Sequence, residues 1–254
     1  MSRYKLTIEY DGRPFAGWQW QNNALTVQQV LQEAVGKFCG ESAEVQGAGR
    51  TDAGVHALAQ VAHVDIVRDT TADTVRDALN FHCQPWPVSV LKAEPVADDF
   101  HARFSAIGRR YRYRIVNRRA RLALDAGRAW QVQVPLDATA MHAAAQLLVG
   151  HHDFSGFRSS QCQARSALKT LDRLDVRREG EAILIEAAAR SFLHNQVRIM
   201  VGTLKRLGEG KLDEDRIRAA LDGGRREEAG PTAPPDGLYL TEVVYPSASS
   251  RELP

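Results

Sequence analysis

Strand-like and helix-like segments alternate along the chain in an order that leaves few folds open. Residues 4–10 alternate between polar and apolar side chains, as a half-buried strand does. From Thr26 to Phe38, apolar residues recur at helical spacing, and Thr26 and Gln29 have the spacing of a capping box. The other elements expected in this half are strands at 44–47, 57–67 and 88–96 and a short helix at 71–80. This order predicts a sheet covered on one side by helices.

The second half of the chain repeats the order of elements with different residues. Residues 168–177 and 182–188 flank Glu179-Gly180 and predict a hairpin. The other expected elements are strands at 109–116 and 238–244, helices at 137–149 and 193–207, and a shorter helix after Asp213. The sequence therefore predicts an α+β protein with two like halves, residues 1–105 and 106–246, followed by a tail at 247–254.

Composition excludes several classes of protein. Of 254 residues, 44% are hydrophobic and 25% are charged, which is ordinary for a globular protein and not for a disordered, collagenous or coiled-coil chain. No segment approaches the roughly 18 apolar residues of a membrane span, and the start shows no apolar signal-peptide core. Cys39, Cys83 and Cys162 form no CxxC pair, which fits a protein of the reducing cytoplasm.

The net charge of +2 is unevenly distributed. Residues 1–105 hold 9 Lys/Arg and 13 Asp/Glu, whereas residues 106–254 hold 24 and 18. Residues 103–128 contain nine arginines and a single acid, Asp125. Such a block indicates a polyanionic partner, although a solvated basic surface with no partner would have the same composition.

Residues 47–56, GAGRTDAGVH, form the most unusual segment. Position 52 is Asp where a dinucleotide fingerprint needs Gly, and the Gly-Lys-Ser/Thr of a phosphate-binding P-loop is missing. What remains is a tight loop that presents Arg50 and Asp52, and glycines let such a backbone approach a ligand closely. A plain turn with a capping Asp is the alternative.

Two further segments carry chemistry. In a strand over residues 110–114, RYRYR, Tyr111 and Tyr113 share one face and the arginines the other, so rings could stack on a base beside guanidinium groups that hold phosphate. The alternative is a strand with a core Tyr face and a solvated Arg face. Arg198, beside an apolar helical stripe, is expected to be partly buried and to need an anion, either a ligand or a structural acid.

Motifs of other catalytic classes are weak or missing. Adjacent residues rarely bind one ion together, so 151–153, HHD, is a poor metal site. The sequence also contains no GxSxG nucleophile elbow.

The string at 47–56 resembles the catalytic motif of the TruA family of tRNA pseudouridine synthases. The resemblance continues in the family's order through 10–12, 15–19, 110–113, 152–155, 192–198 and 233–240. One departure occurs: Asn195-Gln196 stands where the family often has His-Met or Asn-Met, and Arg198 is retained. The resemblance implies two like halves that share a largely antiparallel central sheet, with the catalytic cleft between them. It also implies a homodimer that binds tRNA, modifies uridines 38, 39 and 40 of the anticodon stem-loop, and needs no cofactor or metal.

The resemblance also implies roles for particular residues. Asp52 would be the catalytic carboxylate, acting on C1′ of the ribose, on C6 of the base or on the 2′ proton. Arg198 would be its ion-pair partner, and Arg50 would hold the flipped nucleotide or the space it leaves. Tyr111 and Leu193 would pack on the two faces of the uracil. Arg109, Arg110, Arg112 and Arg114 would hold the tRNA backbone.

Two alternatives remain beside this reading. A non-catalytic RNA-binding protein of the same fold is one, and Asp52 weighs against it because a carboxylate facing RNA costs affinity. A metal-assisted hydrolase built on 151–153 is the other.

Overall fold

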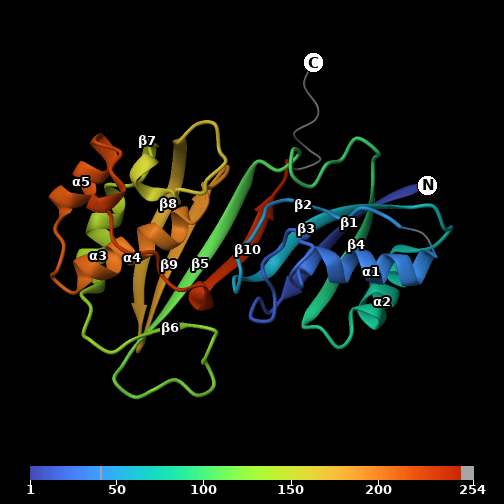
Figure 1. Ribbon diagram of the computed structural model, residues 1–254, viewed down its shortest axis with the longest axis horizontal. Helices are drawn as coiled ribbons and strands as arrows, with labels where there is room; N and C mark the ends of the chain where they lie inside the picture. Colours follow the sequence, from blue (N-terminus) through green and yellow to red (C-terminus); the bar gives the residue numbers. More distant parts are fainter. Residues whose placement is uncertain (41, 247–254) are drawn as a thin grey trace. The chain divides into compact units, whose positions relative to one another are not determined.

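The computed structural model describes residues 1–40 and 42–246, so the predicted tail at 247–254 lies outside it (Figure 1). The strands are β1 (Ser2–Tyr10), β2 (Gln46–Gly47), β3 (His56–Ile66), β4 (Val88–Val96), β5 (Gly108–Asn117), β6 (Trp130–Val132), β7 (Gly150–Asp153), β8 (Leu168–Glu179), β9 (Ala182–Ala189) and β10 (Leu238–Val244). The α-helices are α1 (Val27–Cys39), α2 (Ala72–Cys83), α3 (Ala138–Gln146), α4 (Gln196–Gly208) and α5 (Glu214–Asp222). Short 3₁₀ helices cover Ser155–Phe157, Arg226–Glu228 and Pro235–Gly237. The predicted α+β class is confirmed.

The chain gathers into two compact units. Among the described residues, the first unit holds 1–40, 42–107 and 240–246, and the second holds 108–239. The predicted halves placed 240–246 with the second half of the chain. Hydrogen bonds within the first unit explain the difference, since Ile107 N donates to Val244 O and Tyr245 Oη donates to Ala102 O.

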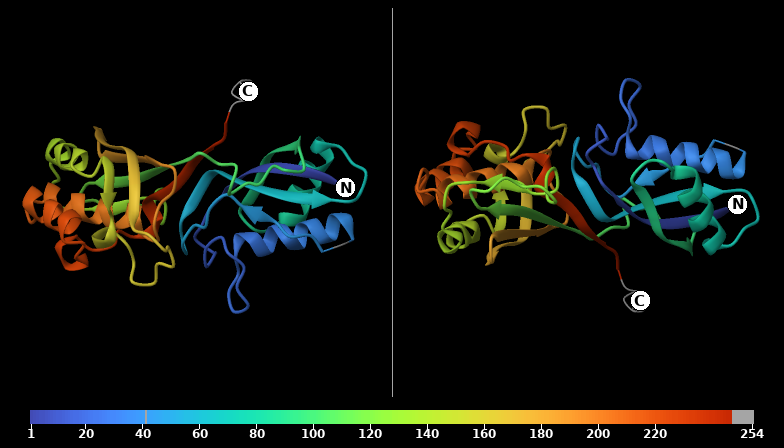
Figure 2. Two further views of the ribbon diagram at one scale, coloured as in Figure 1. Left: turned by 90° about the horizontal axis from the view of Figure 1, so that it is seen from above. Right: turned by 90° about the horizontal axis from the view of Figure 1, so that it is seen from below.

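In the first unit, β1 is the middle strand of an antiparallel sheet, between β3 and β4, and β2 extends β3. Tyr4, Leu6, Ile8 and Tyr10 alternate with more exposed residues and are all buried, so one face of β1 belongs to the core. Helices α1 and α2 lie together on one side of this sheet (Figure 2). The capping prediction is confirmed in part: Thr26 Oγ1 accepts from Gln29 N at 3.2 Å.

The second unit contains the antiparallel order β5-β9-β8-β7, and β6 pairs in parallel with the end of β5. Tyr113, Ile185 and Val176 occupy adjacent positions on these strands, and all three are buried. Helix α3 packs on β8 and on α4. The predicted hairpin is confirmed, and Gly180 supplies the left-handed turn residue at φ 59°.

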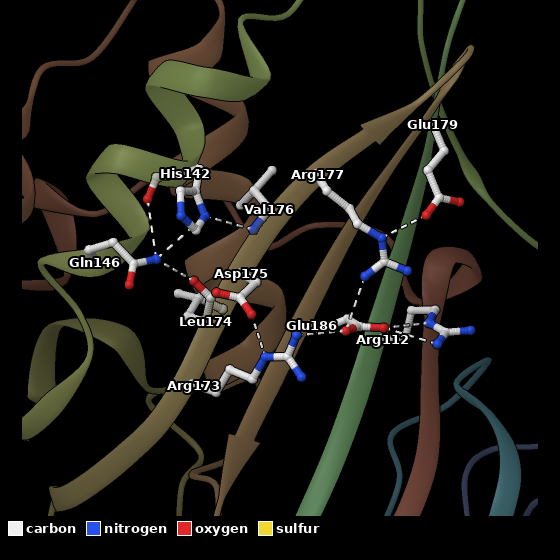
Figure 3. A network of polar contacts seen from close by, with 10 residues as sticks. All are labelled: Arg112, His142, Gln146, Arg173, Leu174, Asp175, Val176, Arg177, Glu179 and Glu186. Atoms are coloured by element: carbon white, nitrogen blue, oxygen red, sulfur yellow. Dashed lines mark hydrogen bonds and ion pairs between the residues drawn. The ribbon is translucent and has the colours of Figure 1, made fainter.

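Helix α3 also protects the exposed edge of β8. On the edge of β8 opposite β9, strand β7 pairs only as far as Leu171, so the later backbone groups on that edge have no strand partner among the described residues. Gln146 Nε2 donates to Leu174 O at 2.9 Å, and Val176 N donates to His142 Nδ1 at 3.2 Å (Figure 3). Two side chains of α3 thus take the place of a neighbouring strand.

Several boundaries differ from the sequence prediction. Strands β6 and β7 were not expected, because three and four residues are too few to show an alternating pattern. Helix α4 begins at Gln196 and not at Leu193, because Asn195 adopts a left-handed conformation at φ 62°. None of the described helices is both long and apolar enough to span a membrane.

Candidate active site

The loop at 47–56 is fastened to the segment that follows β1. Trp18 N donates to Thr51 O at 3.1 Å, and Gly54 N donates to Phe15 O at 3.3 Å. These bonds engage backbone atoms on both sides of Asp52. Residues 15–19, the FAGWQ of the opening motif, therefore form the support on which the loop rests.

Glycines let the two segments come this close. Gly17 has φ +105°, and a Cβ at this position would lie 2.5 Å from Thr51 O. A Cβ at Gly12 would lie 2.1 Å from Val55 O. Gly12 N in turn donates to Nδ1 of the buried His56 at 3.0 Å. Gly12 of the 10–12 motif and Gly17 therefore allow the segment after β1 to pack closely against the 47–56 loop.

Burial alternates along the centre of the loop. The Thr51 side chain is buried, while Arg50 on one side is exposed and Asp52 on the other is half-buried. Thr51 Oγ1 is hydrogen-bonded to Tyr10 Oη at 2.8 Å. The loop therefore directs one polar side chain inward and holds an arginine and a carboxylate toward its outer side.

The second unit builds a turn that positions Arg198. Leu193 N donates to Gln196 Oε1 at 2.8 Å, and Arg198 Nη1 donates to Asn195 Oδ1 at 2.9 Å. Arg198 Nε donates to Ala233 O at 2.8 Å. The guanidinium is half-buried, as predicted, and these two acceptors are neutral oxygens. Both bonds fix the direction of the guanidinium.

The sequence places residue 233 in a family motif without a role for its backbone. In the structure, this backbone holds Arg198 and Tyr113. Ala233 N donates to Arg198 O, so Ala233 binds Arg198 through both of its backbone groups. Tyr113 Oη donates to Pro234 O at 2.7 Å. A Cβ at Gly237 would lie 2.6 Å from Arg114 O, which leaves glycine as the residue that fits. Residues 233–237 therefore connect the Arg198 turn to β5.

The two tyrosines of β5 differ in environment. Tyr113 is fully buried, and burial raises the pKa of its hydroxyl well above the usual range. Tyr113 is therefore a core residue, which is the alternative that the sequence left open. Tyr111 is half-buried, and its ring meets that of Phe192 edge to face with centroids 5.2 Å apart. The structure thus brings Tyr111 beside the turn that contains Leu193.

The arginines of β5 make contacts within the protein and differ in exposure. Arg112 bonds Glu186 at 2.9 Å, Arg114 bonds Asp125 at 2.6 Å, and Arg109 Nη1 donates to Arg190 O at 2.7 Å. Arg110 is exposed. The basic face of the strand is thus partly neutralised by two carboxylates.

Glu186 is shared by arginines of two strands. Arg173 and Arg177 of β8 approach it at 3.3 Å and 3.1 Å, beside Arg112 of β5 (Figure 3). Burial works to raise the pKa of the carboxyl, but hydrogen bonds from Arg112 and Arg177 outweigh burial and hold the pKa below its usual value.

The histidines at 151 and 152 lie on β7 and are engaged in local contacts. His151 Nδ1 is 3.0 Å from Thr170 Oγ1, and His152 Nε2 is 3.0 Å from Val149 O. Within the part of the chain that the structure describes, no group of three or more metal-ligating side chains comes together. A groove of about 700 Å³ lies elsewhere in the second unit, lined among others by Arg206, Lys211 and Arg216, and its lining includes none of the predicted site residues.

The predicted site residues fall into two groups. Arg50 and Asp52 belong to the first unit. Tyr111, Leu193, Arg198 and the four arginines of β5 belong to the second. Each group is held by its own hydrogen bonds, and the first group presents a carboxylate while the second presents aromatic, apolar and guanidinium side chains. Aromatic and guanidinium side chains such as those of the second group are the types that contact RNA bases and phosphates.

Comparison with known proteins identifies the family. The family model described as tRNA pseudouridine synthase matches residues 6–105 and 144–246. The tRNA pseudouridine synthase A of Rhodospirillum centenum is 62% identical over 245 residues, which cover 96% of this chain and 100% of that protein. That of Paramagnetospirillum magneticum is 60% identical and covers 100% of this chain and 99% of its own length. The chain belongs to the tRNA pseudouridine synthase family.

Proposed function

We propose that this protein converts uridine to pseudouridine at positions 38, 39 and 40 of the tRNA anticodon stem-loop, with Asp52 as the catalytic carboxylate. The family of the chain supports the activity, and many relatives bear the name tRNA pseudouridine synthase A. The observation that carries the role of Asp52 is the loop itself. It is fastened on both sides of residue 52, as a loop must be if it delivers one carboxylate to a reacting sugar or base.

The reaction exchanges one glycosidic bond for another. The C1′–N1 bond breaks and its electrons go to the uracil, the base turns, and C5 bonds to C1′. The proton on C5 is then lost to solvent or a base. Asp52 can form an ester at C1′ that C5 later displaces, add to C6 of the ring, or remove the 2′ proton to give a glycal. All three routes need an ionised Asp52, and Arg198 is proposed as its ion-pair partner.

The target uridine must leave the helical stack before a carboxylate can reach it. The exposed Arg50, two residues from Asp52, is suited to holding the flipped nucleotide or the space it leaves. Tyr111 offers a ring braced by Phe192, and Leu193 offers an apolar side chain for the other face of the base. Ala233 O and Asn195 Oδ1 fix the direction in which Arg198 presents its guanidinium.

The arginines of β5 would hold the RNA backbone unequally. Arg112 and Arg114 each share a carboxylate within the protein, so a phosphate must compete with Glu186 or Asp125. Arg110 is the most exposed of the four arginines, and on that ground it is proposed as the principal phosphate ligand of the strand. A homodimer, a cytoplasmic location and a reaction without cofactor or metal complete the proposal, and they rest on the family resemblance.

Mapping the product in a tRNA transcript tests the function. The transcript carries uridine at 38, 39 and 40 and is incubated with the protein in the presence of a chelator. Pseudouridine is then located by carbodiimide labelling and reverse transcription. New stops at these three positions are expected, and a transcript with cytidine there should give none. Binding without modification would favour the RNA-binding alternative, and loss of modification in the chelator would favour a metal-dependent reaction.

A further inference from the structure

We propose that Tyr10, Thr51 and Gln60 form a buried positioning network that fixes the directions of Arg50 and Asp52. The inference rests on the proposed function, because it assigns these residues to the reaction of Asp52. All three are polar residues in the core of the first unit, where a polar side chain is costly unless it is hydrogen-bonded. All three contact one another or the backbone of the 47–56 loop, which suggests a common role in positioning that loop.

The contacts of the network reach both neighbours of Arg50. Tyr10 Oη and Thr51 Oγ1 are 2.8 Å apart, so the last residue of β1 holds the residue between Arg50 and Asp52. Gln60 Nε2 donates to Gly49 O at 2.9 Å, so β3 holds the residue before Arg50. Gln60 is fully buried and also accepts from Val61 N. The backbone that carries Arg50 and Asp52 is therefore anchored through side chains as well as through the segment at 15–19.

The network carries no net charge. Burial raises the pKa of the Tyr10 hydroxyl to about 12, which the hydrogen bonds to Thr51 and Gln60 only partly offset. The phenol stays protonated across the working range of pH, and Thr51 and Gln60 do not titrate. The group cannot act as an acid or base in the reaction, so its contribution is geometric. A misplacement of about 1 Å can cost about 100-fold in rate.

Single-turnover tritium release from C5-labelled tRNA tests the network. Thr51→Val keeps the shape of the side chain and removes the hydroxyl, and Tyr10→Phe removes the other hydroxyl. Each is expected to lower the rate constant about 10- to 100-fold while changing the Kd for tRNA less than about twofold. Thr51→Ser, which restores a hydroxyl, should recover the rate to within about threefold. The ratio of the wild-type rate constant to that of each variant should be the same from pH 6 to pH 9.

Tyr4→Phe is the matched control. Tyr4 lies on the same face of β1, is as buried as Tyr10, and donates its hydroxyl to Thr70 O at 2.8 Å. Tyr4→Phe removes a comparable hydrogen bond outside the loop and should leave the rate unchanged. The double variant Tyr10→Phe/Thr51→Val should be slower than Tyr10→Phe alone by no more than about threefold, because Tyr10→Phe already deletes the Tyr10–Thr51 bond.

The outcomes separate the network from the proposed function. Equal effects of Tyr4→Phe and Tyr10→Phe, or no recovery in Thr51→Ser, would overturn the network. No release by the wild-type protein would overturn the proposed function. Hydrogen exchange tests the network independently of activity. Backbone amides at 50–54 should exchange faster in Thr51→Val than in the wild type or in Tyr4→Phe. Unchanged exchange in Thr51→Val would refute the network.

Discussion

Gly17 shows how much of the candidate site depends on single positions. Its φ of +105° is one that other residues rarely adopt, and a Cβ would collide with the carbonyl of Thr51. Nothing in the sequence around residue 17 shows that it touches the loop at residue 51. The residue types in the 47–56 string predict a candidate site from sequence alone, whereas the segments that support that string could be found only from the folded structure.

Gly17→Ala is expected to lower the free energy of unfolding by about 2 kcal/mol or more and to slow the reaction. The alanine would be strained at a positive φ, and its Cβ would collide with Thr51 O of the 47–56 loop. Gly40→Ala is the matched control, since Gly40 also has positive φ, at +75°, but a Cβ there meets nothing within 4 Å. Urea unfolding and single-turnover rates measure both variants. Gly40→Ala should lower the free energy of unfolding by about 1 kcal/mol and leave the single-turnover rate unchanged. Equal rates for the two variants would contradict the role given to Gly17.

At the scale of elements, long periodic segments could be predicted and contacts between distant segments could not. The spacing of apolar residues placed α1 with its cap at Thr26 and the hairpin of β8 and β9. Strand β7, residues 150–153, has no apolar alternation, and its existence follows from pairing with β8. The start of α4 depends on the left-handed Asn195, a tertiary detail that helical periodicity does not report.

One packing contact in the first unit should make its stability depend on pH. His63 is buried on β3 beside His101, with ring centroids 4.7 Å apart, and its Nδ1 accepts from Ala102 N. Burial, and then the charges of His101 and Arg3, lower its pKa below the usual 6.5, against smaller opposing effects of Asp65 and Glu44. The neutral ring is therefore the form that the fold favours.

The direction of the pH effect follows from that shift. The neutral His63 ring makes its full contribution to the free energy of unfolding above pH 6.5, the usual pKa of histidine. This contribution is lost as the pH falls from 6.5 toward the lower pKa of His63 in the folded state. His63→Asn keeps an acceptor for Ala102 N and does not titrate. Urea unfolding between pH 7.5 and pH 5 should show a steeper loss in the wild type than in His63→Asn. Parallel curves would mean that His63 is not the titrating group.

At the scale of the whole molecule, the charge of the second half is less available than its composition suggests. The arginine block indicated a polyanionic partner, and the structure pairs Arg112 and Arg114 with Glu186 and Asp125. Sequence could not reveal the first pairing, because Arg112 and Glu186 are 74 residues apart. Counting arginines thus overestimates the surface that can meet RNA.

The salt dependence of tRNA binding should distinguish these arginines. Arg110→Gln is expected to weaken binding and to reduce the slope of log K against log salt by about 0.7 to 0.9, the loss of one phosphate contact. Arg112→Gln, two residues further along the same strand, should change the slope less, because Arg112 is less exposed than Arg110 and is bonded to Glu186. Titrations at several salt concentrations measure both variants. A larger change for Arg112→Gln would reverse the assignment.

The most direct test of the account is tritium release from tRNA labelled at uridine C5, with wild-type protein and with Asp52→Asn. Release reports that C5 has been substituted, and the amide keeps the shape of the carboxylate without its charge. The account predicts release by the wild type, loss of at least about 1,000-fold in Asp52→Asn, and tRNA binding within about threefold of the wild type. Release by both proteins at similar rates would mean that Asp52 is not the catalytic carboxylate.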